Sequence, residues 1–454
     1  MDDDYGIVEY FYEHSGHRCG YCKSESTSLS CGMWAHRLTA GIYDDLLNRG
    51  WRRSGEYCYK PMMKTTCCRQ YPIKLDVAEF QLTKSQKKLL KRVHKFLATG
   101  KRSEAEKPED KGDDCAEAAG DRVMEMPDFL DKKSNVQLDL ETCNLKPTGA
   151  TSGSGNEEFV VPEPMDEHPQ KSPERLKEET ASKTEKTTHV PKKGLGADPN
   201  KPKCRKARDI RRERKLLKMS NAGKDLSPSS DKASLFSKKP KNEAKSLEDF
   251  LFEPLPPDAA HKLEYDPKGP YSLGSFHQQY WLDGNLIAVG VIDILPTCLS
   301  SVYLYYNPDY SFLSLGTYAS LREIAYARQL HKMCPSIKDY CMGFYIHTCP
   351  KMRYKGNFSP SRLLCPETYT WHPIEKCKPL LDVNKYCRFE QDPTKGDENA
   401  VRDLDEVMIL HNRTVITYKK YCRLKGNADK PEVREYANLV GKKCIKRLFL
   451  YRKS

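Results

Sequence analysis

The sequence predicts an α+β protein in which two folded parts are joined by a long charged linker. Three observations support this prediction: two cysteine pairs near the N-terminus, a stretch with few aromatic residues between 99 and 245, and strand and helix patterns after residue 246. We therefore divide the chain into a cysteine-rich metal-binding domain (1–98), a disordered linker (99–245) and a mixed αβ domain (246–454).

The composition points to an anionic partner. The 454 residues include 31% charged side chains and carry a formal charge of +13. Such an excess suits a nucleic acid or an acidic peptide. Basic loops and a nuclear import signal would produce the same excess, so composition leaves both explanations open.

The cysteine content indicates a reducing compartment. The start Met1–Asp4 is acidic and leads into no apolar run, so we expect no signal peptide. We also find no apolar stretch long enough to cross a bilayer. We therefore expect a cytoplasmic and nuclear protein with no membrane partner, whose 18 cysteines are metal ligands or small buried side chains.

The first part shows both helix and strand patterns. A helix ending at 48–50 is predicted by apolar residues at helical spacing, namely Trp34, Leu38, Ile42, Tyr43, Leu46 and Leu47. Segments 57–59 and 73–80 are predicted strands. Thr83 begins a second predicted helix with an apolar stripe.

The stretch 99–245 cannot bury enough apolar area to offset the entropy of ordering it. Its basic block, Lys201–Lys218, suits a nuclear import signal or a helix that contacts RNA. A solvated charged linker explains the block equally well.

After residue 246 the patterns become regular. A short amphipathic turn (246–250) precedes strands at 286–295 and 301–306, a helix opened by Ser314–Gly316, and a strand at 340–346. A helix (431–443) and a strand (447–451) follow. Strand, strand, helix, strand with a glycine at the helix start is typical of the N-acetyltransferase (GNAT-like) fold, where the helix N-terminus faces a donor phosphate. Other α/β folds also contain this pattern.

Cys19, Cys22, Cys67 and Cys68 predict a metal site. Two residues between thiols let both sulfurs reach one ion, and a second pair completes a tetrahedron. Four thiolates favour a closed structural zinc site, whereas the adjacent Cys67–Cys68 pair also suits an iron–sulfur cluster. His17, Cys31 and Cys58 are alternative ligands.

Several motifs, in order, resemble the eukaryotic arginyl-tRNA–protein transferase family. They are Cys19–Cys22, Gly50–Gly55, Tyr59–Pro61, Cys67–Cys68, Gly274–Tyr280, Val289–Pro296, Asn307–Tyr310 and Tyr345–His347. The resemblance covers 5–98 and about 272–454. It implies an enzyme that moves arginine from charged tRNA to an N-terminal Asp, Glu or oxidised Cys, and so marks the acceptor protein for ubiquitin-dependent degradation.

The chemistry implied by this resemblance needs positioning groups more than a nucleophile. We expect His277, Gln279 and Tyr280 to orient the arginyl ester, although a turn with satisfied polar side chains would look the same. Asp309 is expected to pair with the arginyl guanidinium or to relay a proton, unless it only forms a turn. Substrate-binding candidates at the following helix are Tyr310 and Gly316, with Gly316 receiving tRNA phosphates.

Three basic residues between the cysteine pairs are candidates for reading the acidic acceptor side chain: Arg53, Lys60 and Arg52. A guanidinium matches a carboxylate with two parallel hydrogen bonds. Solvated surface side chains are the alternative. We expect arginyl-tRNA and acidic acceptor proteins as partners of a monomer.

Two departures from the family pattern stand out. Arg69 follows the cysteine pair where the family usually has proline, and only 265–270 separates Glu264 from Tyr271, where the family carries a much longer segment. We therefore expect a form shortened within the catalytic half, with an unpaired edge strand and uncovered apolar surface. A non-catalytic regulator and a zinc-dependent nucleic-acid-binding protein are the alternative functions.

Overall fold

The computed structural model describes residues 4–102, 245–265 and 269–453. The predicted linker, apart from its first and last few residues, and the basic block 201–218 lie outside the described residues. None of the described helices combines the length and apolar character that a membrane span requires.

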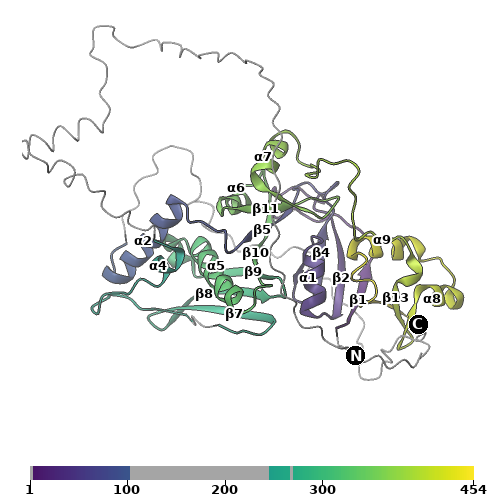
Figure 1. Cartoon of the computed structure of the whole chain (residues 1–454), viewed down its shortest axis with the longest axis horizontal. Helices are drawn as coiled ribbons and strands as arrows, with labels where there is room; N and C mark the ends of the chain where they lie inside the picture. The colour runs from purple at the N-terminus through teal and green to yellow at the C-terminus, as the bar shows by residue number, and fades with distance from the viewer. Residues whose placement is uncertain (1–3, 103–244, 266–268, 454) are drawn as a thin grey trace, which may run out of the picture. The chain divides into compact units, whose positions relative to one another are not determined.

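Two sheets form the folded unit (Figure 1). The seven-stranded sheet has the order β14 (Thr414–Thr417), β13 (Met408–His411), β15 (Leu448–Arg452), β1 (Gly6–Phe11), β2 (Ser30–Arg37), β4 (Tyr57–Pro61), β3 (Arg52–Ser54). The eight-stranded sheet has the order β12 (Trp371–Pro373), β11 (Ser361–Leu364), β5 (Tyr71–Asp76), β10 (Asp339–Tyr345), β9 (Cys298–Tyr306), β8 (Asn285–Ile294), β7 (Gly274–Leu282), β6 (Leu263–Glu264).

Both sheets combine strands from the two ends of the chain. In the seven-stranded sheet, β1 pairs in parallel with β15, so the N-terminal purple strands of Figure 1 adjoin the C-terminal yellow ones. In the eight-stranded sheet, β5 lies between β10 and β11. The domain division at residues 98 and 246 stays a prediction. Each sheet contains strands from both sides of that division.

The helices cover the sheets with their apolar faces. They are α1 (Ala40–Leu47), α2 (Lys84–Thr99), α4 (Leu247–Leu251), α5 (Leu315–Met333), α6 (Pro350–Arg353), α7 (Ile374–Val383), α8 (Tyr418–Lys425) and α9 (Lys430–Val440), with 3-10 helices η5 (Pro308–Leu313), η6 (Tyr354–Asn357) and η7 (Leu404–Glu406). The core of the eight-stranded sheet includes buried side chains of α2, α4, α5 and α7. The core of the seven-stranded sheet includes those of α1, α8 and α9.

Most predicted elements are confirmed. Thr83 caps α2 through a reciprocal capping box with Gln86, and Ser246 does the same for α4 with Asp249. The predicted helix from Trp34 is wrong in its first half. Trp34 lies in β2, paired with Glu9 and Tyr57, and α1 begins only after the N-cap Thr39. Pairing between distant strands overrode the helical spacing.

The edge of the eight-stranded sheet is the place to look for the unpaired strand expected of a form shortened within the catalytic half. β6 pairs only with the last two residues of β7, so most of β7 has no further strand beside it in the described part of the chain. Tyr271, Leu273 and Trp281 are exposed there. These features agree with an edge strand that has lost its neighbour.

β9 and β10 diverge along their length. Their parallel ladder joins Cys298–Ser300 to Asp339–Cys341 and then ends. Beyond it, β9 continues beside β8. On its other side β10 pairs with β5 along its length, with a bulge between Cys341 and Phe344 where Gly343 has a φ of +68°. Because α5 connects these two strands, the place where they diverge lies next to its side chains.

Candidate active site and metal centre

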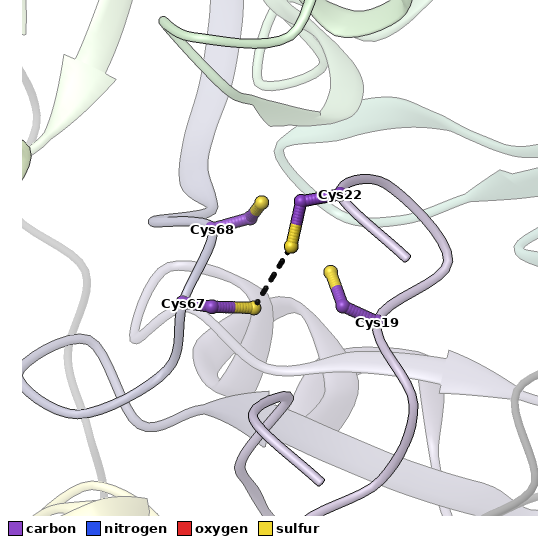
Figure 2. Close-up of side chains that lie close together, drawn as sticks. All are labelled: Cys19, Cys22, Cys67 and Cys68. Atoms are coloured by element: carbon purple, nitrogen blue, oxygen red, sulfur yellow. Dashed lines mark hydrogen bonds between the residues drawn. The ribbon is translucent and has the colours of Figure 1, made fainter. Parts of the chain in front are cut away.

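The four predicted cysteines come together in the structure (Figure 2). Cys19 and Cys22 lie in the β1–β2 connection, and Cys67 and Cys68 in the β4–β5 connection. One sulfur from each lies within 4.8 Å of the others, and the Sγ atoms of Cys22 and Cys67 are 3.6 Å apart. Four Zn–S bonds of about 2.3 Å in a tetrahedron place sulfurs about 3.8 Å apart. The four cysteines therefore lie close enough to bind one metal ion.

Backbone hydrogen bonds hold the two cysteine loops. The N–H of Cys19 donates to the Ser24 carbonyl, and the N–H of Cys67 donates to the Thr27 carbonyl. Partial burial opposes ionisation of Cys22, but hydrogen bonds from the Ser24 N–H and neighbouring thiols lower its pKa to about 7. The predicted alternatives His17, Cys31 and Cys58 are not members of this group.

The cluster also touches the C-terminal half. Ile346 is buried against Cys19 and Cys68, and Cys349 and Met352 pack beside them. These residues follow β10, so the cysteine cluster packs against the segment just after the strand that diverges from β9. A closed, partly buried set of four thiols suits a structural role.

The three basic residues predicted to bind the acidic side chain of the acceptor already have hydrogen-bond partners within the chain. Arg53 forms an ion pair with Asp293, whose side chain is 2% exposed, with Nε 3.1 Å from Oδ2. Arg52 is buried and donates to the carbonyls of Leu47, Trp51 and Gly343.

Lys60 donates to the Tyr369 hydroxyl at 2.7 Å, and burial lowers the pKa of this lysine. These contacts join β3 and β4 to the C-terminal part of the chain. An acceptor carboxylate would have to compete with them.

The predicted polar motif of residues 277–280 is a strand, not a turn. Because side chains alternate along β7, exposed His277 and Gln279 lie on one face and buried Tyr280 on the other. Tyr280 donates to Oε1 of Gln278 at 2.8 Å. The strand therefore separates Tyr280 from its two predicted companions.

A cavity of about 680 Å³ lies along β7. Its lining includes His277 and Gln279 of β7 and Arg322 of α5. Arg322 is buried, donates to the Tyr318 hydroxyl and stacks on Tyr265, with 3.7 Å between its Cζ and the ring centroid. Sequence reasoning missed this arginine, because on a helix of mixed pattern it looked like a solvated charge.

Asp309, Tyr310 and Gly316 lie at the start of the central helix. Asp309 is exposed in η5, and its N–H donates to the Asn307 side chain, which is turn chemistry. Tyr310 is half-buried and packs on the core beneath. Gly316 is the second residue of α5, and a Cβ there would contact nothing within 4 Å.

The α5 N-terminus carries basic neighbours. Ser314, the N-cap, has φ +52° and makes no side-chain cap. Its hydroxyl accepts a hydrogen bond of 2.8 Å from the exposed Arg92 of α2. Arg102 lies over the Phe312 ring, 4.5 Å from its centroid. Free helix N–H groups beside arginines form an environment that favours an anion.

A buried carboxyl was missed altogether. Glu323 of α5 is 1% exposed and accepts a hydrogen bond of 2.6 Å from the Tyr340 hydroxyl of β10. Burial raises the pKa of Glu323 to about 7. One feature of the sequence indicates this buried carboxyl: Glu323 is the one acidic residue in the sequence 315–333, and it falls within an apolar stripe.

Comparisons with known proteins extend this description. Residues 17–88 match the family model "Arginine-tRNA-protein transferase, N terminus", and residues 231–365 match the corresponding "C terminus" model. Arginyl-tRNA–protein transferase 1 of Drosophila melanogaster is 39% identical over 513 aligned positions, which cover 97% of this chain and 98% of the relative. The Arabidopsis thaliana transferase 1 is 30% identical, covering 81% and 73%.

A bacterial relative matches a shorter region. The aspartate/glutamate leucyltransferase of Stutzerimonas stutzeri is 42% identical over 86 residues, which is 19% of this chain and 34% of the relative.

The fold is of mixed α/β architecture, and its four-cysteine group has the spacing of a metal-binding site. The similarity along nearly its whole length then settles the relationship: the chain belongs to the arginyl-tRNA–protein transferase family. The alignment with the Drosophila relative is longer than the 454-residue chain, so that relative carries residues that this chain lacks.

Proposed function

We propose that this chain moves arginine from arginyl-tRNA to the N-terminal Asp, Glu or oxidised Cys of acceptor proteins. The transfer of an amino acid from tRNA to a protein follows from membership of the family: the chain is an aminoacyltransferase that uses charged tRNA and a protein. The attached arginine marks the acceptor for degradation, as the family implies. A non-catalytic regulator is not favoured, because the similarity extends across both halves of the chain.

The choice of acidic acceptors is the finer part of the proposal. The bacterial relative is named an aspartate/glutamate leucyltransferase, which supports an acidic acceptor for the shared segment. The net charge of +13 also favours an acidic peptide and tRNA over basic partners.

The reaction is attack of an amine on an aminoacyl ester. The N-terminal amine must be neutral and close to the ester carbonyl, and the oxyanion must be stabilised until the tRNA hydroxyl leaves. We assign the positioning of the ester to the exposed side chains of His277 and Gln279, which share one face of β7 and line its cavity. Tyr280 positions the neighbouring Gln278 by donating a hydrogen bond to its side-chain oxygen.

The donor end is assigned to the start of α5. A phosphate near Gly316 would meet helix N–H groups and the Arg92 guanidinium. Asp309 is exposed in η5, seven residues before Gly316, and remains our candidate for pairing with the arginyl guanidinium.

The larger sheet is proposed to be GNAT-like. Antiparallel β7–β8–β9, followed by helix α5 and a parallel β10 that diverges from β9, supports this assignment. The four cysteines are proposed to hold zinc or an iron–sulfur cluster, which would fix the two loops. We also propose a monomer in the cytoplasm and nucleus.

A transfer assay tests the function. Purified chain, tRNA charged with radiolabelled arginine, and matched peptides beginning with Asp, Asn or Lys are combined. We expect label in the Asp peptide at least tenfold above the Asn and Lys peptides.

Two outcomes are distinguishable. Equal labelling of the three peptides would contradict acidic selection but leave the transferase activity intact. No labelling by a folded, metal-loaded sample would contradict catalysis by this form.

A further inference from the structure

A second group of metal-ligand side chains lies in the described part of the chain and shares no residue with the four cysteines. His14 follows β1, Cys31 lies in β2 and Glu435 lies in α9. One ligand atom from each lies within 4.8 Å of the others. Three elements that are distant in sequence thus bring together a nitrogen, a sulfur and an oxygen donor.

We propose that His14, Cys31 and Glu435 bind one zinc-class divalent cation, separate from the four-cysteine site. Zinc accepts imidazole nitrogen, thiolate sulfur and carboxylate oxygen. One thiolate and one carboxylate balance the two positive charges of the ion, while four thiolates leave a net charge of −2. The site would tie α9 to the N-terminal sheet.

Hydrogen bonds already join His14 and Tyr10 to Glu435 of α9. Nε2 of His14 is 2.6 Å from Oε1 of Glu435, and the Tyr10 hydroxyl donates to the same oxygen. Nδ1 lies across the imidazole ring from Glu435, so an ion shared by His14 and Glu435 would bind Nε2 and a carboxylate oxygen and take the place of the proton between them. Tyr10 would then hold the Glu435 carboxylate from outside.

Cys31 suits a ligand held inside the protein. It is 4% exposed, so an ion bound to its thiolate would be shielded from solvent on that side. A thiol that coordinates a cation gives up its proton.

Of the three residues, Glu435 borders a surface hollow. A surface hollow of about 570 Å³ is lined by Glu435 and its α9 neighbours Lys430, Arg434 and Asn438. A water or small anion entering from the hollow would complete a tetrahedron. His14 and Glu435 lie outside the regions that the family models match, and Cys31 lies inside the first of them.

Metal content of the full chain tests the proposal. The protein is stripped with chelator, reduced, loaded with Zn²⁺ and desalted, and zinc is measured per chain. We expect two equivalents for wild type and one each for Cys31→Ser, Glu435→Gln and Cys19→Ser. Cys58→Ser, which changes a buried cysteine outside both groups, should retain two.

Co²⁺ loading supplies a second readout that does not depend on activity. In the Cys19→Ser protein, the remaining Co²⁺ should show a charge-transfer band of one-thiolate intensity, and adding Cys31→Ser should abolish it. Glu435→Gln preserves side-chain shape, so loss of one equivalent there with unchanged melting in chelator supports ligation. One equivalent in wild type, or two in both Cys31→Ser and Glu435→Gln, would overturn the proposal and leave the group as a hydrogen-bond network.

Discussion

At the scale of single residues, burial decides what each charged group can do. Arg53 and Asp293 neutralise each other between two strands, whereas buried Glu323 accepts a hydrogen bond from the neutral hydroxyl of Tyr340. Its carboxyl is stabilised in the protonated form, because burial penalises the charge more than Tyr340 and Ser301 stabilise it.

Glu323→Gln is expected to remove part of the pH dependence of stability. In the folded protein the pKa of Glu323 is about 7, against 4.5 ordinarily. The folded state keeps a proton that the unfolded chain loses between these values, so stability falls as pH rises through this interval and levels off above it. The full effect is about 3 kcal/mol.

Urea unfolding at two pH values measures this effect. Glu323→Gln keeps an oxygen for the Tyr340 hydroxyl, so it should match wild type near pH 4.5 and be more stable by about 2–3 kcal/mol at pH 8. Glu375→Gln, on the exposed surface of α7, is the control and should follow wild type at both. Parallel pH curves for Glu323→Gln and wild type would contradict the assignment.

At the scale of elements, local sequence and distant pairing contribute differently. The capping boxes of α2 and α4 and the apolar stripe of α5 are local. The sequence predicts the helices α2 and α5, and a short amphipathic turn where α4 forms. β2 has a local pattern that suits a helix at Trp34, yet it is a strand because β1 and β4 flank it. The cysteine loops have no regular pattern, and only their ligand spacing made them predictable.

Cys67→Ser is expected to lose the metal and to loosen the segment that follows β10. The cluster packs on Ile346, Cys349 and Met352, so hydrogen exchange at 346–353 should increase at least tenfold. Metal analysis and exchange mass spectrometry on the full chain measure both effects.

Cys334→Ser is the control for this prediction, because Cys334 is an exposed cysteine beyond α5. It should retain the metal and the wild-type exchange rates. Unchanged metal in Cys67→Ser would remove this residue from the ligand set.

At the scale of the whole molecule, the two halves of the sequence are interleaved. β15 lies between β13 and β1, and β5 lies between β10 and β11. Arg49, at the end of α1, binds Asp397 with both terminal guanidinium nitrogens, at 3.0 and 2.7 Å. Removing either half would leave strands without neighbours and a buried arginine without its partner.

Separate expression of 1–102 and 245–454 tests this interleaving. Each fragment alone is expected to be insoluble or to unfold without a cooperative transition, and the two co-expressed fragments should associate and recover one. Circular dichroism during urea titration, with the intact chain as reference, measures this. A cooperative transition in 245–454 alone would show that the C-terminal half folds independently.

The sequence alone identified the four cysteines that come together, most helices and strands, and the family, because cysteine spacing, capping residues, periodic apolar positions and family motifs are local features of the chain. The tertiary structure decided which strands are neighbours, that Tyr280 faces away from His277 and Gln279, and that Arg53 is committed to Asp293. It also placed Glu323 in the core and Glu435 beside His14 and Cys31. These features depend on contacts between residues hundreds of positions apart, whose free energy arises only when the whole chain has folded.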